Sequence, residues 1–222
     1  MKTITIVNHD KIPINTRILG IDEAGRGAVI GPLIIAGVTV PEEKLKNIKR
    51  IGVKDSKKLS VKKRMTLSRK IKKIADYQIT CITAEDIDNY RANNKNLNTI
   101  EKDAMKNIVK KADTEKCYID CLDIKEERFH NEMQELYPNI DFTTEHKADD
   151  TYPIVSAASI IAKVERDKII KELKKEYGEI GSGYPSDKKT IKYLKHIPKK
   201  ELPAIVRKSW NTVKNLDTWK IK

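Results

Sequence analysis

The chain has 222 residues, of which 39% are hydrophobic and 35% charged, and its formal net charge at pH 7 is +13. This hydrophobic content excludes a wholly disordered chain, and no apolar run reaches the roughly 18 residues that a membrane span needs. Three cysteines are too few for a disulfide framework, so the composition predicts a cytoplasmic protein without membrane contact.

The positive charge is concentrated in two segments. Residues 44–73 contain fourteen Lys or Arg residues and one acid, and residues 163–222 contain seventeen basic and eight acidic residues. Since the rest of the chain is net acidic, this pattern favours two basic regions that grip a polyanion around a cation-binding centre. Ordinary lysine-rich helix surfaces explain the composition equally well.

Short β-rich runs alternate with longer helical patterns along the chain. Strands are expected at residues 17–21, 30–40, 77–84, 117–122 and 140–146. Helices are expected at residues 60–75, 97–112, 126–137 and 152–178. The first two strands form a hairpin, and right-handed crossovers place the last two parallel to a neighbour. The pattern predicts an α/β domain over residues 17–186, an N-terminal extension over residues 1–16 and a basic helical region over residues 187–222.

Four acidic residues stand out by their context. Asp22 and Glu23 follow the first expected strand, Asp120 lies inside the apolar run CYIDCL, and Asp149 precedes the long last helix. A buried aspartate is costly unless a cation or hydrogen-bond donors satisfy it. Oxygen ligands without clustered His or Cys favour Mg²⁺ or Mn²⁺ over zinc. Two such ions about 4 Å apart suit phosphodiester hydrolysis.

Side chains alternate between the two faces of a strand, which places a condition on this metal hypothesis. Asp22 and Glu23 should face opposite sides, so they can share a site only if the chain bends at Glu23, which Gly25 and Gly27 permit. A charged hairpin turn is an equally good explanation of the pair. A histidine-based ribonuclease mechanism is the rival chemistry, and only His146, three residues before Asp149, lies near a candidate ligand.

The ordered motifs of the chain resemble those of ribonuclease HII, the type 2 ribonuclease H, in its archaeal form. The resemblance spans residues 17–210 and rests on IDEAGRG with IGP, KDSKKLS, YID, EHKADD, YPIVSAASIIAKVERD, GSGYPSD and VRKSW. It implies a ribonuclease H-like mixed five-stranded sheet flanked by helices, with a helical C-terminal extension. It also implies an endonuclease that hydrolyses the RNA strand of RNA/DNA hybrids and cuts 5′ of single ribonucleotides in duplex DNA.

The resemblance further implies the residues that carry this activity. The family's metal-binding tetrad matches Asp22, Glu23, Asp120 and Asp149, which would hold two Mg²⁺ or Mn²⁺ ions and leave 3′-OH and 5′-phosphate ends. The expected partners are the RNA/DNA hybrid and ribonucleotide-containing duplex DNA, and the protein is expected to act as a monomer.

A second set of residues matches the family's substrate contacts. Gly25, Arg26 and Gly27 match the motif that touches the sugar and phosphates at the RNA/DNA junction. Tyr184 matches the ribose-sensing tyrosine, and Lys57 matches a phosphate-contacting lysine. Glycine suits this role because the backbone can approach a sugar closely, and the 2′-OH is the group that separates RNA from DNA.

Two features depart from the family pattern, and two alternative functions stay open. Ala28 stands where many members have proline, which predicts a less rigid loop, and the tail after Trp210 shows no clear motif for binding the sliding clamp. A resolvase or integrase core would share the fold, whereas a non-catalytic basic protein would bind nucleic acid without metal. Ribonuclease HIII is disfavoured by the short sequence before residue 17.

Overall fold

The computed structural model describes residues 2–6, 16–53, 59–121 and 126–216, with side chains from residue 16 onward. Lys57 lies outside these described residues. Among the described residues, no helix combines the length and the apolar character that crossing a bilayer requires.

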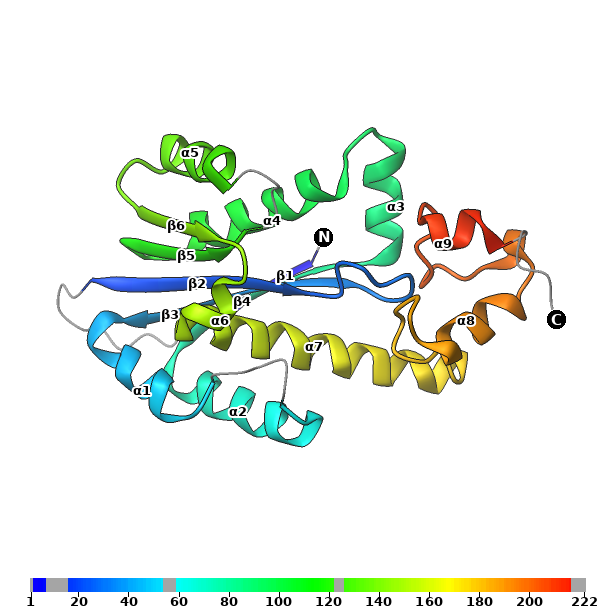
Figure 1. The fold of residues 1–222 in the computed structure, drawn as a ribbon, viewed down its shortest axis with the longest axis horizontal. Helices are drawn as coiled ribbons and strands as arrows, with labels where there is room; N and C mark the ends of the chain where they lie inside the picture. The colour runs from blue at the N-terminus through cyan, green and yellow to red at the C-terminus, as the bar shows by residue number, and fades with distance from the viewer. Residues whose placement is uncertain (1, 7–15, 54–58, 122–125, 217–222) are drawn as a thin grey trace.

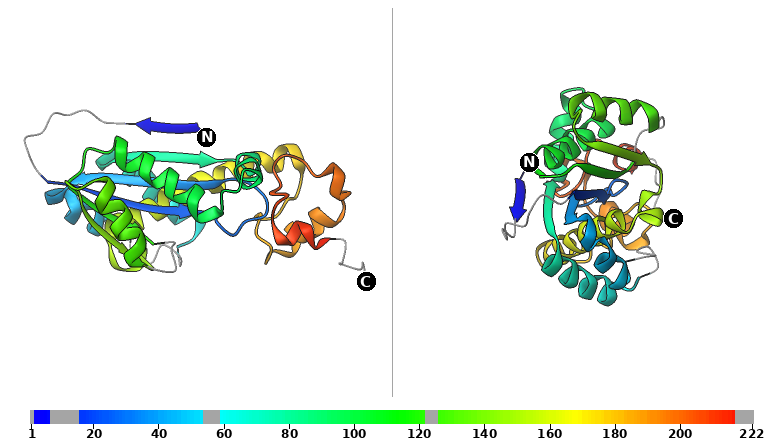
Figure 2. Two further views of the ribbon diagram at one scale, coloured as in Figure 1. Left: turned by 90° about the horizontal axis from the view of Figure 1, so that it is seen from above. Right: turned by 90° about the vertical axis from the view of Figure 1, so that its left-hand side faces the viewer.

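A single mixed sheet forms the centre of the molecule (Figure 1), with the strand order β1-β4-β3-β2-β5-β6. Its strands are β1 (Lys2–Ile6), β2 (Arg17–Ala24), β3 (Leu33–Pro41), β4 (Asp76–Ile82), β5 (Lys116–Asp120) and β6 (Asp141–Glu145). All five expected strands are confirmed, and so are the β2–β3 hairpin and the parallel pairing of β5 with β2 and of β6 with β5. The sixth strand was not expected: β1, within the N-terminal extension, pairs antiparallel with β4 at the edge of the sheet (Figure 2).

Helices cover both faces of the sheet, with α1, α2 and α7 on one face and α4 and α5 on the other (Figure 1). The helices are α1 (Leu45–Arg50), α2 (Val61–Ile74), α3 (Ala84–Ala92), α4 (Leu97–Lys111), α5 (Glu126–Leu136), α6 (Ala148–Thr151), α7 (Pro153–Tyr177), α8 (Lys188–Lys195) and α9 (Asn211–Lys214), with 3₁₀ turns at Glu42–Lys44 and Lys199–Glu201. The four helices expected from the sequence correspond to α2, α4, α5 and α7. Local capping fixes α2 and α4, whose N-cap side chains Ser60 and Asn96 each accept a backbone N–H.

Two apolar layers hold the helices on the sheet. Side chains such as Ile34 and Ala158 fill the layer under α7, while Leu19 and Met105 belong to the layer under α4. Helix α7 packs so closely on β2 that a Cβ at Gly20 would lie 2.5 Å from the carbonyl carbon of Ile154. This close approach brings the middle of α7 to the end of β2.

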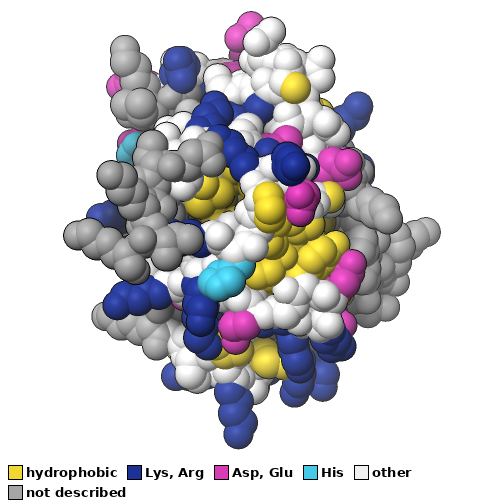
Figure 3. Space-filling model, turned by 90° about the vertical axis from the view of Figure 1, so that its right-hand side faces the viewer, with side chains coloured by type: hydrophobic (Ala, Val, Ile, Leu, Met, Phe, Trp, Pro, Cys, Tyr) yellow, Lys and Arg dark blue, Asp and Glu magenta, His cyan; other side chains and the backbone are white. Residues whose placement is uncertain are grey.

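A third apolar cluster joins the C-terminal region to the loop after β2. Val29 and Ile30 of that loop pack with Ile180, Leu194 and Val206. The region therefore packs against the sheet domain at the end of α7 (Figure 1). On the end face of the molecule, Lys and Arg side chains gather above and below a central group of hydrophobic side chains, with some Asp and Glu side chains against that group (Figure 3).

Candidate active site

Three carboxylates meet where β2 and β5 lie side by side. Oxygen atoms of Asp22, Glu23 and Asp120 lie within 4.8 Å of one another, and Asp22 is buried while the other two are half-buried. The parallel pairing of β2 with β5 explains the meeting, since it places Asp120 one residue beyond the partner of Ile21. The strand pairing thus brings together Asp22 and Asp120, two of the four acidic residues that stand out in the sequence.

The approach of Asp22 to Glu23 has a different cause from the one expected. The ladder between β2 and β3 continues through Ala24, so the predicted bend at Glu23 is absent. Alternation instead turns Asp22 toward α7, where Ser159 donates a hydrogen bond to it, and turns Glu23 toward Glu101 of α4. The Asp22 carboxylate folds back along the strand, and its Oδ1 accepts the Glu23 amide at 2.7 Å.

The cluster has the properties of a site for a hard divalent cation. Oε2 of Glu23 is buried and has no hydrogen-bond partner among the described residues, which is costly without a positive charge nearby. Asp120 accepts the amide of Ala148 through Oδ1 at 3.1 Å, which fixes its carboxylate. Three carboxylates without His or Cys fit Mg²⁺ or Mn²⁺, as expected from the sequence.

Mutual repulsion and burial alter the acidity of this cluster. Burial, with the nearby Glu23 and Asp120 charges, raises the pKa of Asp22 well above its ordinary range. Burial and the Glu101 charge raise the pKa of Glu23 to about 7. Burial also raises the pKa of Glu101 to about 7, although Arg26 opposes this shift. A bound cation would reverse the repulsion.

We expect the metal-free protein to lose stability as the pH rises from about 4.5 to about 7. In this window folded Glu23 and Glu101 keep a proton that the unfolded chain, with the ordinary pKa of 4.5, has released. The folded state binds more protons, so the free energy of unfolding falls with rising pH. Denaturant unfolding across this window measures the slope, which Glu23→Gln should reduce. Mn²⁺ binding requires ionised carboxylates and should strengthen over the same window. A flat stability profile in the wild type would contradict the assignment.

Asp149 is not one of the carboxylates that meet within 4.8 Å. It is buried in the short helix α6, directly after Ala148, whose amide binds Asp120. Ser156 fixes the turn by donating its hydroxyl to the Asp149 carbonyl at 2.5 Å. A cavity of about 320 Å³ opens next to it and is lined by Lys49, Val53, Asp150, Thr151, Pro153 and Ser156. The position of Asp149 agrees with its predicted role as the fourth ligand, which stays a prediction.

The loop after β2 is closely packed at its first glycine and open at its second. Gly25 has φ +90°, and a Cβ there would lie 2.5 Å from the carbonyl oxygen of Pro32, so only glycine fits. Gly27 is exposed, and a Cβ there would meet nothing within 4 Å. Ala28 is buried and its amide donates to the Gly25 carbonyl at 3.2 Å, a turn-closing hydrogen bond that proline lacks.

Arg26 is held in place by two residues of α4. Its Nε donates to both carboxylate oxygens of Glu101, at 2.9 and 3.0 Å, and Nη2 donates to Asn98 at 2.6 Å. The Glu101 side chain is fully buried, whereas the Arg26 side chain stays 38% exposed. The sequence did not identify Glu101, because it lies on the buried face of an ordinary amphipathic helix pattern.

Arg207 of the VRKSW motif holds the same loop from the C-terminal region. It is fully buried and donates to the carbonyls of Gly25, Arg26 and Gly31 at 2.7, 2.9 and 3.1 Å. Burial and the neighbouring Arg166 charge lower the pKa of Arg207 to about 9. The sequence signal for Arg207 is the VRKSW motif, which belongs to the family resemblance.

Tyr184 is brought to this loop by its neighbouring glycine. The Gly183 carbonyl accepts the amides of Val29 and Ile30 at 2.8 and 3.0 Å. The half-buried Tyr184 ring lies against the Arg166 guanidinium, whose central carbon is 4.6 Å from the ring centroid. The structure thus brings Tyr184 and the GRG loop together at one end of the sheet.

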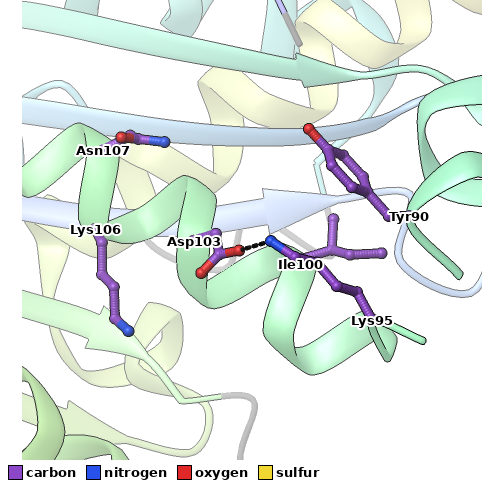
Figure 4. A pocket seen from close by; sticks show the side chains of 6 residues that line it. All are labelled: Tyr90, Lys95, Ile100, Asp103, Lys106 and Asn107. Atoms are coloured by element: carbon purple, nitrogen blue, oxygen red, sulfur yellow. Dashed lines mark hydrogen bonds and ion pairs between the residues drawn. The ribbon is translucent and has the colours of Figure 1, made fainter. Parts of the chain in front are cut away.

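His146 and a cavity on α4 lie outside this arrangement. The His146 ring contacts the Cys121 carbonyl at 3.0 Å, and Nε2 lies 3.7 Å from Glu126, so the contacts found for it link chain segments. A cavity of about 330 Å³ between α3 and α4 (Figure 4) is lined by Tyr90, Lys95, Ile100, Asp103, Lys106 and Asn107. Lys95 pairs with Asp103 at 2.8 Å and Lys106 with Glu132 at 2.5 Å, so neither lysine offers an unopposed charge.

Fold and site together define a metal-dependent hydrolase of the ribonuclease H-like class. The model of the family "Ribonuclease HII" matches residues 19–213. A protein named Ribonuclease HII from Methanosphaera stadtmanae is 56% identical over 201 residues, which cover 90% of this chain and 95% of that protein. The chain belongs to the ribonuclease HII family, whose members are endonucleases that hydrolyse RNA in RNA/DNA hybrids. The expected class of enzyme is thereby confirmed.

Solved structures agree with the expected fold. Ribonuclease H2 from Pyrococcus horikoshii aligns with a TM-score of 0.82 at 39% identity, covering 91% of this chain and 98% of that one. RNase HII from Archaeoglobus fulgidus, solved in a complex with PCNA, aligns with a TM-score of 0.85 at 42% identity, covering 92% and 98%. The sequence-based doubt about a sliding-clamp partner finds no support in this comparison, since that relative was solved with PCNA. Bst-RNase HIII, at 19% identity and a TM-score of 0.75, shares the fold.

Proposed function

We propose that this chain cuts duplex DNA on the 5′ side of a single ribonucleotide, besides hydrolysing the RNA strand of hybrids. Hydrolysis would leave 3′-OH and 5′-phosphate ends and would use two Mg²⁺ or Mn²⁺ ions. The observation that carries the proposal is the carboxylate cluster of Asp22, Glu23 and Asp120 directly beside the GRG loop. The expectation of a cytoplasmic monomer stays a prediction.

The carboxylates would hold the ions, with Asp149 as a further ligand. When bound, such ions activate a water molecule and stabilise the leaving 3′ oxygen. The chain's own contribution is geometry, because hydrogen bonds from the Glu23 and Ala148 amides fix two of the carboxylates before substrate arrives. Attack by water accounts for the proposed ends, since attack by the ribose 2′-OH would give a cyclic phosphate.

The GRG loop beside the cluster is the part of the chain that would contact the sugar and phosphates at the RNA/DNA junction. Gly27 faces open space, so backbone can approach a sugar there without steric hindrance. Arg26 keeps part of its guanidinium exposed while Glu101 and Asn98 hold the rest. A shallow groove of about 380 Å³ adjoins both residues and is lined by Arg26, Gly27, Arg91, Leu97, Ser209, Trp210, Asn211 and Thr212. Its cationic and aromatic side chains suit a nucleic-acid backbone.

Tyr184 is proposed to stack on the sugar or base next to the ribonucleotide. Such stacking contributes about 1–3 kcal/mol, so Tyr184→Ala should lower cleavage of a duplex with one ribonucleotide by about 10- to 100-fold. Tyr184→Phe keeps the ring and should stay close to the wild type. Steady-state cleavage rates on labelled duplexes are compared between both variants and the wild type.

The substrate range tests the proposed function directly. With Mg²⁺ or Mn²⁺, the wild type should cut an RNA/DNA hybrid and a duplex with one ribonucleotide but leave the all-DNA duplex intact. Equal cutting of all three duplexes would favour a nuclease of the resolvase kind. Salt-sensitive binding without any cleavage would favour a non-catalytic protein.

A further inference from the structure

Ser159 lies at the contact between α7 and the carboxylate cluster. It is fully buried, and its side chain donates a hydrogen bond to Asp22. One helical turn later, Lys163 donates from Nζ to the Ser159 Oγ at 2.7 Å. A continuous chain of hydrogen bonds therefore runs from the half-buried Lys163 through Ser159 to a candidate metal ligand.

The direction of these hydrogen bonds follows from the chemistry of the groups. A lysine ammonium has donors and no acceptor, and a serine hydroxyl has one proton and two lone pairs. Lys163 must therefore occupy a lone pair of the Ser159 oxygen, which leaves the single hydroxyl proton for Asp22. Without Lys163 the hydroxyl could rotate and donate elsewhere, as serines in helices often do toward the preceding turn.

Asp22 then has two fixed donors, one from each side. The Glu23 amide donates to Oδ1 at 2.7 Å along the strand, and Ser159 donates from the helix packed on the strand. Both donors restrict rotation of the carboxylate. The approach of α7 to β2 at Gly20 is close enough to make the second donor available.

We propose that Ser159 and Lys163 are positioning residues that orient the Asp22 carboxylate for the divalent cation. The small residues at 156–159 let α7 approach the sheet, and Ser159 has this polar role in addition. Partners of metal ligands commonly change metal affinity by about 10- to 100-fold. The inference rests on the proposed function, since it assumes that Asp22 holds the metal.

A calorimetric titration of the nucleic-acid-free protein with Mn²⁺ tests this inference. Ser159→Ala should weaken Mn²⁺ binding by about 10- to 100-fold, and Lys163→Met should weaken it by a similar or smaller factor. The double variant should bind Mn²⁺ within about twofold of the affinity of Ser159→Ala alone. The reason is that Lys163 acts through the Ser159 hydroxyl, which both variants lack. Ser68→Ala, another buried serine, and Lys168→Met, a lysine of α7 paired with Glu165, serve as controls and should bind Mn²⁺ like the wild type.

Three results separate the explanations. If Ser159→Ala binds Mn²⁺ as tightly as the wild type, the positioning role is wrong. If Lys163→Met weakens Mn²⁺ binding equally with and without Ser159, Lys163 acts through its charge. The proposed relay, the hydrogen-bond chain from Lys163 through Ser159 to Asp22, is then wrong. Failure of the wild type itself to bind Mn²⁺ would overturn the metal site and, with it, the proposed function. Should Ser159→Ala not fold, Lys163→Met alone decides, because wild-type Mn²⁺ affinity in that variant would overturn the relay.

Discussion

Asp120→Asn is expected to abolish cleavage, by about a thousandfold or more, while the fold stays intact. Asparagine has the shape of aspartate but lacks the charge that a shared divalent cation requires. The substitution also removes one of the charges that raise the pKa of Asp22 and Glu23. The metal-free variant should therefore unfold at the same or a higher temperature than the wild type. Cleavage assays with Mg²⁺ or Mn²⁺ and thermal unfolding of the metal-free protein provide the two measurements.

This combination distinguishes a lost ligand from a damaged fold. The matched control is Asp141→Asn at the other end of the parallel β5–β6 pair, on an exposed residue paired with Lys116 in the ladder. It should cut like the wild type. Full activity of Asp120→Asn, or lost activity with a strongly lowered unfolding temperature, would contradict the role of Asp120 as a ligand.

Arg207→Met is expected to lower the free energy of unfolding by about 3 to 5 kcal/mol. Methionine keeps much of the buried volume, but it removes the guanidinium donors to the carbonyls of Arg26 and Gly31 and leaves the Gly25 carbonyl with the Ala28 amide alone. Because the same carbonyls fix the loop that is proposed to read the junction, the variant should also raise the KM for ribonucleotide-containing duplexes. Denaturant unfolding and steady-state kinetics give the two values.

The neighbouring Lys208 provides a control for Arg207. Lys208 is exposed, and its backbone amide is held by Asp88 of α3 at 2.7 Å, so Lys208→Met keeps that contact. The control should change stability by less than about 0.5 kcal/mol. A similar small effect of Arg207→Met would show that the buried guanidinium does not hold the loop.

Local signals in the sequence were sufficient for most of the fold. The hairpin of β2 and β3 and the helices α2, α4 and α7 follow from periodicity and caps that lie within each segment. Strand β1 was missed because a short segment at the end of the chain pairs with β4, far along the sequence. Short helices such as α6 and α9 depend on tertiary contacts and carry little periodicity.

The acidic residues could be predicted, whereas the residues that hold them could not. Asp120 was conspicuous because a charge inside an apolar strand needs a partner. Glu101 and Ser159 sit inside helix patterns that ordinary packing explains, so their roles emerge only when α4 and α7 are placed against the strand ends. The predicted bend at Glu23 was wrong because a side chain can fold back where the backbone stays regular.

The end groups released from a duplex with one ribonucleotide test the central claim most directly. The wild type, given Mg²⁺ or Mn²⁺, should cut on the 5′ side of the ribonucleotide and leave a 3′-OH and a 5′-phosphate, as water activated at the cluster of Asp22, Glu23 and Asp120 requires. A cyclic phosphate on the 3′ side of the ribonucleotide, formed without divalent metal, would contradict the claim.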